Sequence, residues 1–273
     1  ASVRRHFSAP IDVLLHMQVS SRANLLALLL PARRKLGFPT HLSRELHGLA
    51  VSERVSAPPR PHVLEAFQAF AHALGVPAFE PSWNIPIPEE DRHWAREKVP
   101  HDEPLLLISP AASKPERCWS AEAYAAMAEH AMAKGYHVLL TSGPATWEQE
   151  LASHIATLCS RPLTNLAGQT SLKQLLALLG RAQIVLAPDS GPAHMATTQG
   201  TPVIGLYAHS NPDRTGPFNS RHTVVETYHS NIQRQYGVSE SALPWGARAK
   251  GDALMLEIPL EAVREQFDRL TGA

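Results

Sequence analysis

The feature that most constrains the fold is a regular alternation of short apolar runs and longer amphipathic segments between about residues 103 and 225. The apolar runs are continuously hydrophobic, which is typical of parallel strands covered on both faces. They lie at 104–109, 136–141, 183–187, 202–207 and 223–226. The intervening segments have helical patterns and lie at 120–135, 147–159, 171–180 and 192–200. Such repeats imply right-handed crossovers, so the sequence predicts an α/β fold with a doubly wound sheet.

The first hundred residues carry a weaker version of the same pattern. We expect a strand at 11–17, a helix near 21–30, a strand near 34–38 and a helix at 62–75. The proline-rich stretch 76–92 is expected to be a linker, because turn-forming residues do not fit the interior of an element.

The chain of 273 residues exceeds the usual single-domain size of roughly 100–200 residues, so two domains are expected. We predict that residues 1–95 form one Rossmann-like domain and residues 96–250 a second. Residues 251–273 are predicted to carry a C-terminal helix that could pack back on the first domain. The strand-like run at 11–17 follows Ala1 closely, so the N-terminal domain is predicted to be incomplete in this chain.

Composition excludes several classes of function. The 25 basic and 25 acidic residues balance, which removes the electrostatic argument for a nucleic-acid partner. The 15 histidines are scattered without the spacing of a metal site. The only cysteines, Cys118 and Cys159, indicate a reducing compartment. The longest apolar stretch is too short to cross a bilayer. These features predict a cytosolic protein, with a peripheral membrane contact left open.

The most informative motif lies between two of the predicted strands, at residues 189–194. In open α/β sheets, ligands bind where strands end and helices begin. Gly191 lets the backbone approach a ligand, Ser190 can cap the helix or contact an oxygen, and Pro192 suits a first helical turn. The N–H groups of that turn favour a phosphate, and His194 would face the same ligand. The alternative is that Asp189 and Ser190 only cap the helix while His194 packs as an ordinary histidine.

Three stretches carry a resemblance to a known family. The first stretch, 189–218, carries the motif residues Asp189, Ser190, Gly191, His194, Gly200, Pro202, Asn211, Pro212, Gly216 and Pro217. The second, 108–124, has the basic residue Arg117 two positions before Trp119, and the third, 166–191, leads into the main motif. Together they closely resemble the signature of the bacterial lipopolysaccharide heptosyltransferases, glycosyltransferase family 9, of the heptosyltransferase I-like kind. The resemblance covers most of 103–226 and, more loosely, 10–75 and the C-terminal helix.

The resemblance implies two facing Rossmann-like domains of the GT-B type. The C-terminal domain would bind ADP-heptose, and the N-terminal domain would bind an anionic glycolipid, the lipid A-core acceptor. The implied reaction is an inverting heptose transfer that requires no metal and no cofactor. The enzyme would work in the cytoplasm, in peripheral contact with the cytoplasmic face of the inner membrane.

The resemblance also assigns residues to the donor site. These are Ser113, Lys114, Arg117, Thr170, Asp189, Ser190, Gly191, Pro192 and His194. Lys114 and Arg117 are the candidate charges for the leaving diphosphate. Arg117 stands where the family usually has lysine, and Ala112 stands where it has a hydroxylated residue. The family often places an acid against the nucleotide base or ribose, and here Glu148 comes slightly late in the corresponding loop.

In the acceptor half, the resemblance points to the basic residues Arg44, Arg54 and His62, with His47 nearby. Their alternative role is that of solvated side chains near a loop. The catalytic base of the family is an aspartate in a Gly-Asp turn after its first strand. No such turn precedes the run at 11–17, so no catalytic residue is assigned.

Other functions stay open. One is transfer or epimerisation of another sugar nucleotide, such as a UDP-sugar, and another is non-catalytic binding of a sugar nucleotide. A dinucleotide-dependent oxidoreductase is disfavoured because no G-x-G-x-x-G follows any predicted strand. A metal-dependent transferase is disfavoured because no Asp-x-Asp follows a strand.

Overall fold

The computed structural model describes residues 9–100 and 103–272, and the chain divides into two compact units at Pro81 and Ser82. Unit 1 contains a parallel three-stranded sheet in the order β1-β2-β3. Its elements are β1 (Ile11–His16), α2 (Ser21–Leu29), β2 (Ala32–Gly37), α3 (His47–Ala50), β3 (Glu53–Arg54) and α4 (Val63–Ala73). Phe70 of α4 and Leu36 of β2 are buried in its core.

Unit 2 contains six parallel strands in the order β6-β5-β4-β7-β8-β9. Its strands are β4 (Leu105–Ile108), β5 (His137–Leu140), β6 (Thr164–Asn165), β7 (Ile184–Pro188), β8 (Val203–Tyr207) and β9 (Val225–Glu226). Its helices are α5 (Glu89–Lys98), α6 (Ala121–Ala133), α7 (Thr146–Leu158), α8 (Leu172–Leu179), α9 (Gly191–Thr198), α10 (Pro212–Thr215), α11 (Tyr228–Tyr236) and α12 (Leu260–Thr271). This order is that of a doubly wound sheet whose direction of winding reverses between β4 and β7.

The apolar runs of unit 2 are continuous because both faces of the sheet are covered. Successive strand residues point to opposite faces, so Leu106 and Ile108 contact one core while Leu105 and Leu107 contact the other. The first core contains residues of α6, α7, α11 and α12, and the second contains residues of α5, α8 and α9. The predicted α/β class with parallel sheets is therefore confirmed.

The structure corrects the predicted boundary between the two units. The units divide between Pro81 and Ser82 rather than near residue 95. The cause is α5, which begins after Pro88 with three acidic residues in its first turn, a charge pattern that favours a helix N-terminus. Ala95 of α5 is fully buried in the core to which α8 also contributes. Helix α5 begins at Glu89, so the last residues of the expected linker belong to a helix of unit 2.

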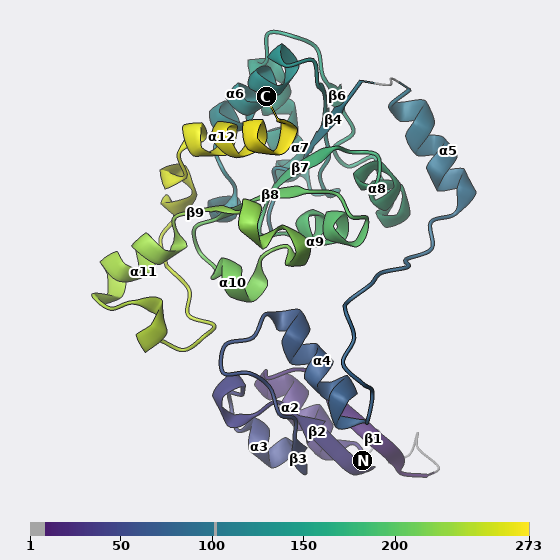
Figure 1. Cartoon of the computed structure of the whole chain (residues 1–273), viewed down its shortest axis with the longest axis vertical. Helices are drawn as coiled ribbons and strands as arrows, with labels where there is room; N and C mark the ends of the chain where they lie inside the picture. Colours follow the sequence, from purple (N-terminus) through teal and green to yellow (C-terminus); the bar gives the residue numbers. More distant parts are fainter. Residues whose placement is uncertain (1–8, 101–102, 273) are drawn as a thin grey trace. The chain divides into compact units, whose positions relative to one another are not determined.

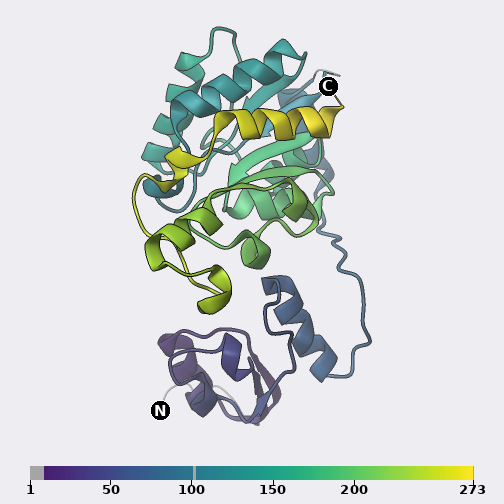
Figure 2. The same cartoon turned by 60° about the vertical axis from the view of Figure 1, so that its left-hand side comes forward.

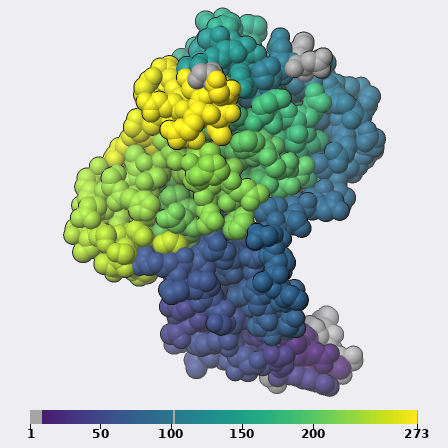
Figure 3. Space-filling model, viewed as in Figure 1, coloured from purple at the N-terminus to yellow at the C-terminus, as the bar shows by residue number. Residues whose placement is uncertain are grey.

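The C-terminal helix is part of unit 2. Helix α12 packs on α6 (Figures 1–3, yellow beside teal), and its contact with the first domain stays a prediction. Phe267 is fully buried and makes edge contacts with the rings of Tyr136 and His130. The physical reason is the amphipathic pattern of α12, whose apolar face completes the core on this side of the sheet. No helix of the described residues is long and apolar enough to cross a membrane.

We predict that Phe267→Ala lowers the stability of unit 2 by about 3–5 kcal/mol, since it removes a fully buried aromatic side chain and leaves a cavity. Urea unfolding measures the change. The control is Leu256→Ala, at a side chain that is 61% exposed, for which we expect a change within about 0.5 kcal/mol. Equal effects of the two substitutions would contradict the position of α12 in the core.

Candidate functional site

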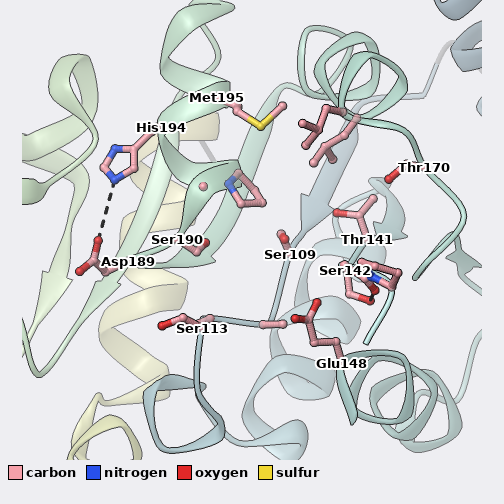
Figure 4. Close-up of a pocket in the computed structure, with 18 of the residues that line it drawn as sticks. Ser109, Ser113, Thr141, Ser142, Glu148, Thr170, Asp189, Ser190, His194 and Met195 are labelled. Carbon is pink, nitrogen blue, oxygen red and sulfur yellow. Dashed lines mark hydrogen bonds and ion pairs between the residues drawn. The ribbon is translucent and has the colours of Figure 1, made fainter. Parts of the chain in front are cut away.

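A pocket of about 640 Å³ opens at the carboxyl ends of the central strands of unit 2. Its lining comes from the segments that follow β4, β5 and β7 and from the beginnings of α8 and α9 (Figure 4). The winding of the sheet reverses between β4 and β7, so the loops after these two strands diverge and leave a crevice there. The sheet order thus places the pocket where open α/β sheets bind ligands.

The start of α9 forms one wall of this pocket. Ser190 is the N-cap residue, but its side chain makes no capping hydrogen bond, and its hydroxyl oxygen has no partner among the described residues. A Cβ added at Gly191 would meet no atom within 4 Å. Pro192 follows in the first turn, where its missing N–H costs nothing. The first turn of α9 therefore offers free backbone N–H groups and open space, which is the environment that an anion favours.

Asp189 anchors this region of the site. Its Oδ2 accepts hydrogen bonds from Nη2 of Arg117, at 2.8 Å, and from Oγ of Ser210, at 2.5 Å. The hydroxyl of Tyr207 lies 3.4 Å from Oδ1, and Nε2 of His194 lies 3.8 Å from it. The carboxylate therefore joins the loops after β4, β7 and β8.

The surroundings of Asp189 keep it ionised. Burial alone would raise the pKa of this carboxyl group, but the interactions with His194 and Ser210 and the charge of Arg117 outweigh burial and lower the pKa below its ordinary value. The same carboxylate, together with burial, raises the pKa of Tyr207 well above its ordinary value, so the phenol stays protonated as a donor.

Hydrogen bonds from both terminal nitrogens of its guanidinium group hold Arg117 in place. One nitrogen, Nη1, donates to the hydroxyl of Ser113 at 3.1 Å while Nη2 contacts Asp189. The short helix that carries Arg117 is contacted by the buried ring of His209, whose Nε2 lies 3.1 Å from the carbonyl oxygen of Glu116. Arg117 and Ser113 both line the pocket, so an ordered cation faces it.

The opposite end of the pocket has a different character. It is lined by Thr141, Ser142 and Glu148 from the β5–α7 segment, by Thr170, and by the apolar side chains of α8. A Cβ at Gly143 would come within 2.5 Å of a carboxylate oxygen of Glu148, so glycine is what lets this carboxylate lie against the loop. The pocket thus has one cationic, N–H-rich end and one end with hydroxyl, carboxylate and apolar groups.

Most of the predicted donor-site residues line this one pocket. They are Ser113, Arg117, Thr170, Asp189, Ser190, Gly191, Pro192 and His194. Lys114 does not line it; its ammonium group pairs with Glu116 at 3.4 Å, and its side chain is 67% exposed. Sequence reasoning missed Ser109, Thr141, Tyr207 and Ser210, although Ser109 and Thr141 are the last residues of two predicted strands and could have been found by that position.

The acceptor candidates lie in unit 1. The guanidinium of Arg54 donates to the carbonyl oxygen of Phe38 at 3.0 Å, and His62 is buried as the capping residue of α4. Arg44 is exposed. Two of the three predicted residues therefore have structural partners within unit 1, and their contact with an acceptor stays a prediction.

A buried polar network lies at the carboxyl edge of the sheet in unit 1. The side-chain oxygen of Asn24 accepts hydrogen bonds from Nε2 of His16, at 2.7 Å, and Nδ1 of His47, at 3.0 Å. His47 can donate from Nδ1 because its Nε2 accepts from the backbone N–H of Phe38. Burial and the neighbouring His16 and Arg54 lower the pKa of His47. His47 is thus a neutral structural residue rather than a cation for a ligand.

No group of three or more His, Cys, Asp or Glu side chains in the described parts of the chain could hold a metal ion.

Comparison with known proteins places the chain among sugar-transferring enzymes. The family model described as "Glycosyltransferase family 9 (heptosyltransferase)" matches residues 2–245. The chain is 46% identical over 259 residues to the lipopolysaccharide core heptosyltransferase OpsX of Haemophilus influenzae, covering 95% of this chain and 75% of the relative. It also matches lipopolysaccharide heptosyltransferase 3 of Escherichia coli K12, but spans only 65% of that relative's length.

Two solved structures show the same fold. A family 9 glycosyl transferase from Veillonella parvula superposes with a TM-score of 0.73 at 23% identity, covering 98% of this chain and 75% of the other. The ADP-heptose lps heptosyltransferase II of E. coli superposes with a TM-score of 0.65 at 20% identity, covering 98% and 78%.

The lowered pKa of Asp189 generates a prediction about acid stability. A lowered pKa in the folded state means that the ionised carboxylate stabilises the fold above the ordinary value of 3.8, and that this contribution is lost as the pH falls below it. We expect Asp189→Asn to cost about 2–3 kcal/mol at neutral pH. The difference from the original protein should shrink below about pH 4.

Thermal unfolding of both proteins between neutral pH and pH 3 measures this difference. The matched control is Asp252→Asn, at an exposed carboxylate, for which we expect little difference at any pH. If the stability difference between Asp189→Asn and the original protein stayed constant down to pH 3, the conclusion that an ionised Asp189 stabilises the fold would be wrong.

Proposed function

The chain belongs to glycosyltransferase family 9, the heptosyltransferases, and we propose that it transfers a heptose from ADP-heptose to the lipopolysaccharide inner core. The class of enzyme rests on the family and on the relative OpsX, a lipopolysaccharide core heptosyltransferase. The observation that carries the choice of site is the pocket where the winding of the unit 2 sheet reverses. It combines an open helix N-terminus with an oriented arginine, and these are the groups that a nucleoside diphosphate requires.

We assign the cationic end of the pocket to the diphosphate of the donor. The backbone N–H groups at Gly191 and the start of α9 would donate hydrogen bonds to its oxygens, with the unpartnered hydroxyl of Ser190 beside them. Arg117 would contribute charge and directional donors, and Ser113 would contribute a hydroxyl. In this proposal Asp189 does not bind a sugar hydroxyl, since its oxygens are engaged. It is a positioning residue for Arg117, while His194, whose side chain is 47% exposed, faces the donor.

The chemistry is an inverting displacement at the anomeric carbon. The acceptor hydroxyl oxygen forms the new bond to that carbon as the bond to the diphosphate oxygen breaks, and ADP leaves with the electron pair. Negative charge builds up on the leaving diphosphate. Donors that are already oriented stabilise this charge without reorganising during the reaction. The start of α9 and Arg117 take this role without a metal ion, and the acceptor's proton is removed by a base to which we assign no residue.

The first test is calorimetric titration with ADP and with UDP, each in the presence and absence of a chelator. We expect binding of ADP that the chelator does not change, and weaker binding of UDP. Transfer of heptose from ADP-heptose to a core acceptor completes the test. A preference for UDP would favour another sugar-nucleotide enzyme instead, and binding without transfer would favour a binding protein.

Titration of the Gly191→Ala variant with ADP tests whether the diphosphate binds at the start of α9. The added methyl group meets no protein atom within 4 Å, so the thermal stability should be unchanged. It would occupy the space assigned to the diphosphate, and we expect ADP affinity to fall at least about tenfold, or 1.4 kcal/mol. The control is Glu150→Ala, at an exposed residue outside the pocket lining. Unaltered affinity in Gly191→Ala would exclude the start of α9 as the phosphate site.

We further propose that the acceptor is the anionic lipid A-core glycolipid and that the enzyme makes peripheral contact with the cytoplasmic face of the inner membrane. Helix α2 supports this proposal because Leu25 and Leu26 are 59% and 54% exposed, with Leu28 and Leu29 also exposed and the cation Arg22 on the same helix. Exposed leucines beside a cation are typical of helices that lie at a charged bilayer surface.

Sedimentation with vesicles tests this contact. We expect the protein to bind vesicles that contain anionic lipid, and to bind them several-fold less when Leu25 and Leu26 are both changed to serine. Leu158→Ser, at an exposed leucine of unit 2, is the control. Absence of binding in the original protein would remove the membrane contact from the proposal while leaving the transfer reaction intact.

A further inference from the structure

Thr141 is the first residue after β5 and has an unusual environment. It is 1% exposed, and its backbone N–H donates to the carbonyl oxygen of Ile108 at 3.0 Å, which continues the sheet. Its hydroxyl oxygen, however, is buried and has no hydrogen-bond partner among the described residues. The side chain lies in the lining of the pocket, and Figure 4 shows it above Ser142 and to the right of Ser109.

An unpartnered buried hydroxyl is uncommon, because nearly all buried polar groups in folded proteins are hydrogen-bonded. Within the described parts of the chain, four buried side-chain atoms lack a partner, and two of them are nitrogens of Arg181 and Arg264. The other two are the hydroxyls of Thr141 and Ser190, and both of these residues line the pocket. The unpartnered hydroxyls thus coincide with the pocket rather than being spread through the protein.

The order of the strands separates these two hydroxyls. Ser190 follows β7 and Thr141 follows β5, with β4 between them. Neighbouring strands lie about 4.8 Å apart, so the two positions differ by roughly 10 Å across the sheet. Ser190 is beside the N–H groups of α9, whereas Thr141 is on the side of Glu148, Thr170 and the apolar residues of α8.

We propose that Thr141 is a specificity-determining residue whose hydroxyl binds the nucleoside half of the donor. The inference rests on the proposed function, which places the diphosphate at α9. A nucleoside attached to that diphosphate would extend across β4 towards β5, where an apolar wall and polar groups suit a base and a ribose. A threonine hydroxyl both donates and accepts, so it can pair with a sugar hydroxyl or with a polar edge of the base.

The test compares the unchanged protein with Thr141→Val and Thr141→Ser. Valine keeps the shape of threonine but lacks the hydroxyl. We expect Thr141→Val to have an unchanged or raised melting temperature without ligand, since no hydrogen bond of the free protein is lost. Its affinity for ADP should fall about tenfold, which is 1.4 kcal/mol, and its affinity for AMP should fall by the same factor. Thr141→Ser should bind both like the original protein.

Inorganic pyrophosphate and Thr146→Val provide the controls. Thr146 is an exposed threonine at the first position of α7 and is not part of the pocket lining, so its substitution should change neither affinity nor stability. Pyrophosphate should bind the original protein and Thr141→Val equally.

Four results would overturn the proposal. Unchanged ADP affinity in Thr141→Val would exclude the contact. Loss of melting temperature together with affinity would mean that Thr141 has a structural role. Weaker binding of pyrophosphate by Thr141→Val would mean that the Thr141 hydroxyl contacts the phosphates and not the nucleoside. If the original protein failed to bind ADP, the proposed function would be refuted, and the inference with it. If the original protein bound ADP and Thr141→Val bound it equally well, only the inference about Thr141 would be refuted.

Discussion

The arrangement of the candidate site depends on one buried carboxylate. Asp189 directly follows β7, and its Oδ2 accepts hydrogen bonds from Arg117, which follows β4, and from Ser210, which follows β8. Three loops that are far apart in the sequence are therefore tied to one charge. Because the pair is largely buried, removal of either partner would leave the other charge uncompensated. The geometry of this wall of the pocket consequently follows from the interactions of Asp189 with Arg117 and Ser210.

Stability and binding make opposite demands on the polar groups of this pocket. Ser190 caps α9 only through its backbone, and Thr141 buries a hydroxyl without a partner. Both arrangements cost free energy in the empty protein. The protein can bear this cost because the sheet beneath is covered on both faces by two apolar cores. A ligand with matching groups would recover it on binding.

The sequence predicted five of the strands of unit 2 and helices α6, α7, α8 and α9, since their periodicity is local, but not the short elements β6, α10 and α11. It also named Asp189, Ser190 and Gly191, which line the pocket, because they follow a buried strand. It could not predict that Ser210 and Tyr207 would engage Asp189, since such pairing depends on how β7 and β8 lie together. For the same reason it could not show that Lys114 is exposed whereas Arg117 pairs with Asp189, although both were candidate charges. Helix α5 was missed because the prolines before it concealed its start.

The parallel sheet has a consequence for how this pocket can change during evolution. Its two ends are attached to different strands, β7 and β5, with β4 between them, and strand spacing is fixed by backbone hydrogen bonds. The sheet therefore fixes the distance between the two ends of the pocket, and side-chain substitutions do not alter this distance. Replacements in the β5–α7 segment can change which group is recognised at one end without moving the start of α9 at the other. In the proposed assignment, recognition of the nucleoside and stabilisation of the leaving diphosphate are therefore separable parts of a single cavity.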